Sequence, residues 1–276
     1  MDCEHMKLLC DLHTHSTASD GQYSPSELVH MAAAAGIELL ALTDHDTLDG
    51  LAEAAGASGA AGLRLLPGVE LSAAEYDTFH ILGYGFDPAA PPLGELCRRM
   101  RVRREERVPR LLAYLRERGV VLNMEELRAL AGKDAVGRPH FARSMVRRGY
   151  VRDSREAFDR YLDTEDYHRQ VERGKPSVGE CIAAIHESGG WASLAHPYQI
   201  GLEDGALERL VARLAVDCGL DAIECFYPRH TPEQTALYLR LAERYRLCVT
   251  GGSDFHGERV KPDISLTPWE LALERL

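Results

Sequence analysis

Residues 10–20 read Cys-Asp-Leu-His-Thr-His-Ser-Thr-Ala-Ser-Asp, and the interpretation of the whole chain starts from this stretch. An apolar run predicts a first strand over Leu8–Leu12, which opens into His13 and His15. Because alternate side chains of an extended segment share a face, we expect both imidazoles to point the same way off the strand end. Asp20 follows at the far side of a short polar loop. A His-x-His pair also occurs in tags, loops and protein cores, so a metal site here needs partners from elsewhere in the chain.

Size and composition are those of a globular protein. The chain has 276 residues, of which 45% are hydrophobic and 27% charged, which suits one main domain with an insertion. No apolar run reaches the roughly 18 residues of a membrane helix, and the N-terminus lacks a signal pattern. The seven cysteines are scattered, without a Cys-x-x-Cys pair, and are expected to be reduced thiols. These features predict a cytoplasmic protein with no membrane partner.

Charge is distributed unevenly along the chain, although the net charge is −11. The segment from Arg98 to Arg173 contains 19 Arg and one Lys against 13 acidic residues, a net charge of +7, which leaves −18 for the rest. Solvated helix faces account for most of these arginines individually. A carboxylate-rich body with an Arg-rich segment also suits metal ions in the body and an anionic substrate.

Strand and helix patterns alternate in both halves of the chain, which predicts an α/β fold with a parallel sheet or barrel. Ser24-Pro25-Ser26-Glu27 has the residues that begin a helix, and residues 267–276 are expected to form a closing helix. Ligand-type side chains stand at most of the strand ends, where parallel α/β folds build their sites. The seven strand candidates are Leu8–Leu12, Ile37–Leu42, Leu63–Leu66, Phe79–Tyr84, Trp191–Ala195, Ala222–Phe226 and Leu247–Thr250.

Between these halves lies a segment with helical periodicity and no strand candidate. We therefore predict a barrel domain over residues 1–90 and 174–276, with an inserted Arg-rich, lid-like helical subdomain over 91–173. Its expected helices are Leu93–Arg118, Met124–Ala131, Arg138–Arg148 and Arg152–Leu162.

The polar residues at the strand ends form a set rich in imidazoles. Nine donors exceed what one ion needs, since zinc takes about four ligands and Mn²⁺ or Fe²⁺ up to about six, so two or three divalent ions are expected. Glu70, a carboxylate among imidazoles, is the natural bridge. Mn²⁺ fits this mixture, Fe²⁺ and Zn²⁺ are alternatives, and Mg²⁺ fits less well because it prefers oxygen ligands. The candidate metal ligands are His13, His15, Asp20, His45, Glu70, His80, His196, Asp254 and His256.

Four blocks of sequence resemble the polymerase and histidinol phosphatase (PHP) family of metal-dependent phosphoesterases. They are Asp11-Leu12-His13-Thr14-His15-Ser16 with Asp20; Thr43-Asp44-His45-Asp46; Gly68-Val69-Glu70 followed by His80; and Ala195-His196-Pro197 with Ser253-Asp254-Phe255-His256-Gly257. The resemblance implies a distorted seven-stranded (β/α)7 barrel that holds a trinuclear metal centre, with all nine positions as ligands. No ligand position of the family pattern is missing.

The insertion, with Gly137-Arg138-Pro139-His140-Phe141, resembles the branch of nucleoside 3′,5′-bisphosphate phosphatases and 5′-to-3′ exoribonucleases. Arg138 is our first choice for a substrate-phosphate contact, because guanidinium binds phosphate with a planar fork; its alternative is a helix-opening role. His140 has either a substrate contact or a structural role at a helix N-terminus. Arg229 and His230 follow a strand end and are further candidates for phosphate contact.

These residues predict a phosphoric ester hydrolase that acts on a small nucleotide or on the 5′ end of a short RNA. A metal-bridging hydroxide would attack phosphorus, with Glu70, His196 and Arg138 as the catalytic residues; His196 or a metal-bound water would protonate the leaving oxygen. Asp11, Asp44 and Asp46 are expected to orient imidazoles. The alternatives are a cyclic phosphodiesterase, a histidinol phosphate phosphatase, and a non-catalytic metal-stabilised module that binds nucleic acid.

Overall fold

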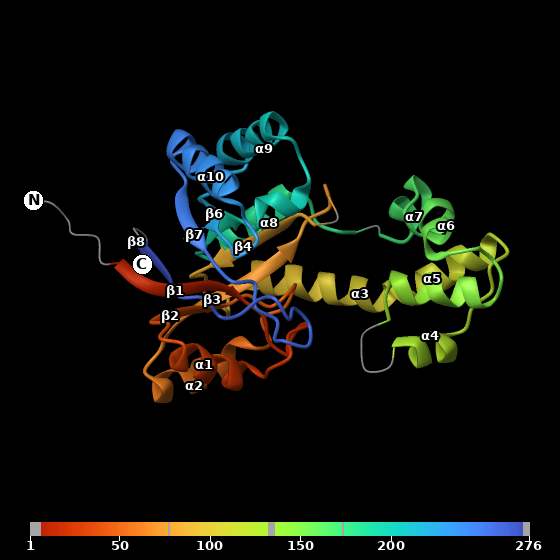
Figure 1. Ribbon diagram of the computed structural model, residues 1–276, viewed down its shortest axis with the longest axis horizontal. Coiled ribbons are helices and arrows are strands. Elements are labelled where there is room, and N and C mark those ends of the chain that lie inside the picture. The colour runs from red at the N-terminus through yellow and green to blue at the C-terminus, as the bar shows by residue number, and fades with distance from the viewer. Residues whose placement is uncertain (1–6, 77, 132–135, 173, 273–276) are drawn as a thin grey trace, which may run out of the picture. The chain divides into compact units, whose positions relative to one another are not determined.

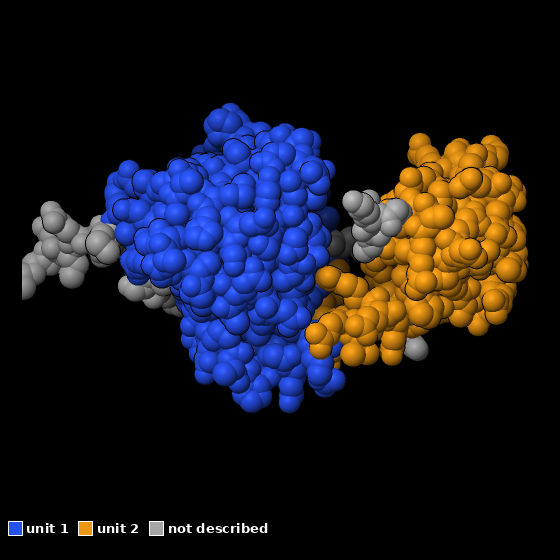
Figure 2. Space-filling model, turned by 90° about the horizontal axis from the view of Figure 1, so that it is seen from below, with its two compact units in different colours: residues 1–98, 176–276 blue, residues 99–175 orange. Residues whose placement is uncertain are grey.

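Two compact units make up the chain. The computed structural model describes residues 7–76, 78–131, 136–172 and 174–272. The barrel unit comprises residues 1–98 and 176–276, and the insertion unit residues 99–175, as Figure 2 colours them. The insertion unit starts later than the predicted 91 because the helix that begins at Pro91 spends its first turns in the barrel unit, where the backbone N–H of Leu93 donates to Ser188 Oγ at 3.1 Å.

One eight-stranded sheet forms the barrel unit (Figure 1). Its spatial order is β7-β6-β5-β4-β3-β2-β1-β8, and the edge strands β7 and β8 also lie near each other, which nearly closes the sheet. The strands are β1 (Lys7–Thr14), β2 (Leu39–Leu42), β3 (Arg64–Ser72), β4 (His80–Tyr84), β5 (Trp191–Leu194), β6 (Ala222–Phe226), β7 (Cys248–Gly251) and β8 (Trp269–Ala272). The predicted α/β barrel class is thus confirmed, with all seven predicted strands present and β8 in addition.

Strand β4 runs antiparallel to both of its neighbours, whereas the sequence pattern predicted parallel strands. The connection from β3 covers only residues 73–79, too short for the crossover that a parallel partner requires. In the resulting register Ser72 faces His80, so the first residue of β4 lies beside the carboxyl end of β3. The reversal places His80 at the same rim as the other ligand candidates.

The closing helix predicted over residues 267–276 is wrong, because β8 occupies Trp269–Ala272 and pairs antiparallel with β1. Burial explains the strand: Leu271 is 3% exposed, and the Trp269 ring stacks on Phe226 at 5.7 Å. Side chains at alternate positions of a strand can cover the open edge of the sheet in this way. Residues 273–276 of the predicted helix lie outside the described residues.

Helices on the outside of the sheet begin with the signals expected from sequence. Ser24 and Glu27 form a reciprocal capping box with Pro25 in the first turn of α1, and Thr231 with Gln234 does the same for α10. The helices of this unit are α1 (Pro25–Ala34), α2 (Leu51–Ala61), α8 (Val178–Glu187), α9 (Asp204–Asp217) and α10 (Pro232–Tyr245), with a 3₁₀ turn at Pro197–Ile200.

The described residues of the insertion unit form helices joined by turns and loops, without a strand. The unit has its own apolar core, in which Leu115, Leu127 and Phe141 are fully buried. It contains most of α3 (Pro91–Glu117), then α4 (Met124–Ala131), α5 (Arg138–Arg147), α6 (Ser154–Ala157), a π-helical turn (Phe158–Leu162) and α7 (Glu165–Gln170). Helix α7 was not predicted. Among the described residues, no helix has the length and apolarity that crossing a membrane requires.

Candidate metal centre

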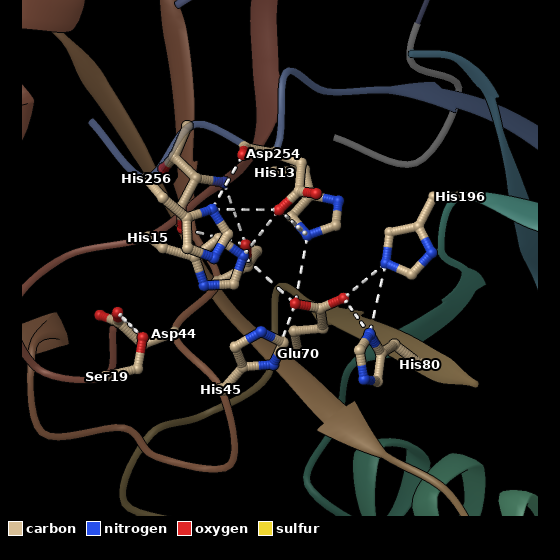
Figure 3. Close-up of polar contacts among 12 residues, drawn as sticks. His13, His15, Ser19, Asp44, His45, Glu70, His80, His196, Asp254 and His256 are labelled. Carbon is tan, nitrogen blue, oxygen red and sulfur yellow. Dashed lines mark hydrogen bonds and ion pairs between the residues drawn. The ribbon is translucent and has the colours of Figure 1, made fainter. Parts of the chain in front are cut away.

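The nine predicted ligands come together at one end of the barrel (Figure 3). Six strands supply them: His13 is the last residue but one of β1, with His15 and Asp20 following that strand, His45 follows β2, Glu70 lies in β3, His80 opens β4, His196 follows β5, and Asp254 and His256 follow β7. The carboxyl ends of parallel strands meet at one rim. Strand β3 is longer than predicted, so Glu70 is held inside the sheet rather than in a loop after it.

Glu70 is the centre of this cluster. Its Oε2 lies 3.3 Å from His13 Nε2, 3.2 Å from His15 Nε2 and 3.1 Å from His45 Nδ1. Its Oε1 lies 2.9 Å from both His80 Nδ1 and His196 Nε2. One carboxylate with imidazoles around each oxygen is the arrangement that a ligand bridging two cations has.

Two further carboxylates complete the cluster on its other side. Asp254 Oδ1 lies 3.3 Å from His15 Nε2 and 3.3 Å from His256 Nδ1. Asp20 Oδ1 lies 3.3 Å from His256 Nε2. Within the described residues, donor atoms that lie within 4.8 Å of one another form three overlapping groups, namely His15, Asp20, His45 and His256; His13, His15, Glu70 and Asp254; and His45, Glu70 and His80.

Several buried nitrogen and oxygen atoms of the cluster have no hydrogen-bond partner, and such atoms fit a site that binds metal ions. They include His13 Nε2, both ring nitrogens of His15, His45 Nδ1 and Glu70 Oε2. A buried polar atom without a partner costs free energy, and these atoms converge without the alignment of a hydrogen bond. Divalent cations would satisfy them together.

Electrostatics favour cations at the same place. Burial raises the pKa of the Glu70 carboxyl, but the surrounding imidazoles hold that pKa well below its usual range. Burial lowers the pKa of His15, yet Asp254 and Glu70 raise it to about 9 overall, so negative charge dominates there. Burial lowers the pKa of His45 to about 3, which keeps this imidazole neutral and able to bind a metal.

Glu224 is a buried member of the site that the sequence analysis missed. It lies in β6 with no exposed surface, and its Oε1 is 3.1 Å from His13 Nδ1. Its Oε2 accepts the backbone N–H of His196 at 2.7 Å. A carboxylate behind a metal-binding imidazole fixes the tautomer and the ring orientation. An acidic residue in the apolar run Ala-Ile-Glu-Cys-Phe was the signal that could have revealed it.

The three aspartates expected to orient imidazoles have other partners. Asp44 accepts from the Ser16 backbone and from the hydroxyls of Ser16 and Ser19. Asp11 accepts backbone N–H groups, among them that of Ser253 at 2.8 Å, and Asp46 accepts from Ser72. The expectation is wrong for Asp11 and Asp44, because the loops around the site need acceptors for their own N–H groups.

Strained and close-packed backbone positions two of the ligands. His196 and Asp254 have φ values of 24° and 58°, a region that residues other than glycine rarely adopt. Gly252 lies so close to β1 that a Cβ atom there would be 2.2 Å from His13 Cβ. The segment after β7 therefore approaches His13 only because residue 252 has no side chain.

Each of the four predicted substrate contacts has a hydrogen-bond partner within its own unit. In the insertion unit, Arg138 Nη1 donates to Asp163 Oδ1 at 3.1 Å, and His140 Nδ1 accepts the Gly137 backbone N–H at 2.9 Å. That contact is the structural one of the two roles expected for His140. In the barrel unit, Arg229 forms a bidentate pair with Asp263, and His230 Nδ1 contacts the Cys225 carbonyl at 3.1 Å. A role in substrate binding stays a prediction for all four residues.

Comparisons with known proteins agree with a metal site that acts on phosphate esters. The PHP domain model matches residues 11–170. A 5′-3′ exoribonuclease of Haemophilus influenzae is 36% identical over 247 residues, which cover 89% of each chain. A 3′,5′-nucleoside bisphosphate phosphatase of Chromobacterium violaceum is 36% identical over 248 residues, covering 89% of this chain and 86% of that protein. A solved structure, an amidohydrolase from Chromobacterium violaceum with bound sulfate, is 34% identical with a TM-score of 0.69, covering 94% of this chain and 91% of that one.

Proposed function

The chain belongs to the PHP family and is a metal-dependent phosphoric ester hydrolase, and on that premise we propose that it releases phosphate from a small nucleotide or from the 5′ end of a short RNA. The observation that carries the proposal is the convergence of nine imidazole and carboxylate side chains around Glu70. Two relatives that match nearly the whole chain are named for reactions on nucleoside bisphosphates and on RNA.

We propose that all nine residues ligate metal and that the site takes three ions, since the donors form three overlapping groups. Mn²⁺ is the ion we expect, with Fe²⁺ or Zn²⁺ as alternatives and Mg²⁺ less suited to so many imidazoles. When bound, such ions would supply a more acidic water molecule as the nucleophile and would neutralise charge on the phosphoryl oxygens.

The side chains of this chain have distinct tasks in the reaction. Glu70 holds the imidazoles on either side of it at a fixed separation. His196 stands at the edge of the cluster against Glu70 and His80, where it could donate a proton to the leaving oxygen. Arg138 is proposed to bind the developing charge with its guanidinium fork.

Charge supports a small substrate rather than a long polymer. The chain outside residues 98–173 carries −18, against +7 within that segment, so a long polyanion would be repelled by most of the molecule. A substrate of one or a few nucleotides needs only local cations. The six free cysteines among the described residues suit a reducing compartment, and we propose a cytoplasmic location.

A panel of substrates tests the proposed class. Phosphate release with Mn²⁺ would be compared for a nucleoside 3′,5′-bisphosphate, a cyclic nucleotide, histidinol phosphate and a short 5′-phosphorylated RNA. We expect the bisphosphate or the RNA to give the highest kcat/KM. No activity on any nucleotide, with turnover of histidinol phosphate, would reject the proposal. Nucleic-acid binding that survives Glu70→Ala, without hydrolysis by wild type, would indicate a non-catalytic module.

A further inference from the structure

Both carboxylate oxygens of Asp254 have partners, and the partners of Oδ2 are not among the nine predicted ligands. While Oδ1 faces the imidazoles of His15 and His256, Oδ2 accepts the Tyr227 hydroxyl at 3.0 Å and lies 2.5 Å from Lys261 Nζ. The ammonium is therefore one carboxylate away from the metal-binding imidazoles. All of these residues belong to the barrel unit, so the contact does not depend on the insertion.

The loop that carries Lys261 is fixed rather than free. Gly257 has a φ of 95°, and a Cβ atom there would be 2.4 Å from Gln22 Cβ. The backbone N–H of Lys261 donates to the Gly257 carbonyl at 2.9 Å, and Ile264 beyond it is 3% exposed. The Lys261 side chain itself is only 24% exposed. An exposed lysine would lose side-chain entropy on binding substrate, whereas this one is already ordered.

Lys261 also has bonding capacity left for a ligand. A lysine ammonium has three N–H donors, and Asp254 takes one of them. Arg229, the cation of the barrel unit that the sequence predicted to contact phosphate, has its Nε and Nη2 directed at both oxygens of Asp263. Between these two cations of the barrel unit, Lys261 is the one that touches the metal-binding cluster.

We propose that Lys261 binds the phosphoryl group of the substrate: its ammonium positions Asp254 through one N–H and donates another to a non-bridging phosphoryl oxygen. This inference rests on the proposed function only in requiring a phosphoryl group at the cluster, and not on the nucleotide. The positive charge complements the anionic substrate beside the carboxylates Glu70, Asp20 and Asp254.

The test uses the full-length, Mn²⁺-loaded protein with inorganic phosphate as the probe. We expect Lys261→Met to raise the inhibition constant of phosphate and the KM of the best substrate by about 10- to 100-fold, the range for a lost charged hydrogen bond, with metal content unchanged. Lys261→Arg should recover much of the loss. Arg259→Met, which removes an exposed cation from the same loop, should behave as wild type, and Lys261→Gln replaces the Met variant if that one unfolds.

Two results would overturn the proposal. One is a phosphate inhibition constant within twofold of wild type in Lys261→Met. The other is a loss of metal in that variant which excess Mn²⁺ reverses together with phosphate affinity, because Lys261 would then act on Asp254 alone. A wild type that hydrolyses only phosphate esters other than nucleotides would reject the proposed substrate class and leave the inorganic phosphate measurement fully interpretable.

Discussion

The residues of this site differ in how readily the sequence predicts them. The imidazoles recur at strand ends in short motifs, so the sequence motifs alone were enough to predict that they lie around Glu70. Lys261 could not be found this way, because a lysine in a polar loop is usually solvated. Only the fold shows that its ammonium meets Asp254. Glu224 lies between these cases, since its charge in an apolar run is a local signal but its partner, His13, is 211 positions away.

Glu224→Gln tests the role of the buried carboxylate behind His13. The amide keeps the size of the side chain but lacks the charge that holds the imidazole in its metal-binding tautomer. We expect metal affinity to fall by about 10- to 100-fold with little change in thermal stability, measured by metal titration of the apoprotein. Glu258→Gln is the matched control, because Glu258 is exposed and contacts Tyr23 at 2.7 Å. Equal metal affinities of wild type and Glu224→Gln would contradict the assignment.

Elements were predicted best where the local pattern decides them. Helix α4 was predicted at Met124–Ala131 and lies there, because its pattern and termini are local. The strand identity of β8 depends on β1, a partner distant in sequence. The direction of β4 depends on the short connection over residues 73–79, which the hydrophobic pattern does not report. Periodicity over ten residues cannot report a partner at the other end of the chain.

Gly252→Ala tests the close approach of the segment after β7 to β1. The added methyl group would contact His13 Cβ and backbone atoms of the same residue, which cannot move without shifting a ligand. We expect a loss of about 1–3 kcal/mol in the free energy of unfolding, together with weaker metal binding. Denaturant unfolding and metal titration measure the two effects.

A glycine in open space supplies the control for that variant. A Cβ atom at Gly59 in α2 would meet nothing within 4 Å, so Gly59→Ala should stabilise the protein by about 0.5–1 kcal/mol. If Gly252→Ala were as stable as wild type and bound metal equally well, the proposed need for glycine at residue 252 would be wrong.

The stability of the insertion unit should depend on pH through the ionisation of Glu172. Burial raises the pKa of this carboxyl, but the Tyr167 hydroxyl at 2.6 Å and the guanidinium of Arg103 outweigh burial and lower it. A carboxyl with a lower pKa in the folded state stabilises that state above its unfolded pKa of about 4.3 and loses this contribution as the pH falls through the folded pKa.

Glu172→Gln should therefore lower the Tm by several degrees at pH 7, with a gap to wild type that narrows toward pH 3. Thermal melts at the two pH values measure this gap. Glu117→Gln is the control, since the Glu117 side chain is 71% exposed. A gap of equal size at both pH values would show that the ion pair does not account for the stability.

At the scale of the whole molecule, the sequence predicted a barrel with a helical insertion because each part has its own apolar pattern and its own core. It also predicted which side chains meet around Glu70, because the barrel architecture gathers strand ends at one rim. The unit boundary within α3 could not be read from sequence, since helical periodicity continues unbroken from Pro91 to Glu117. The substrate cannot be read from the rim residues either, because the proposed metal ligands would contact the phosphoryl group and not the rest of the substrate.

The metal content and activity of Glu70→Gln test the central claim most directly. Purified wild type should bind three divalent ions per chain and release phosphate from its best substrate. Glu70→Gln keeps the volume of the side chain but weakens the bridge between the imidazoles on its two sides. We expect it to lose at least one ion per chain and at least about 100-fold in kcat. Full metal content with undiminished phosphate release in this variant would contradict the account.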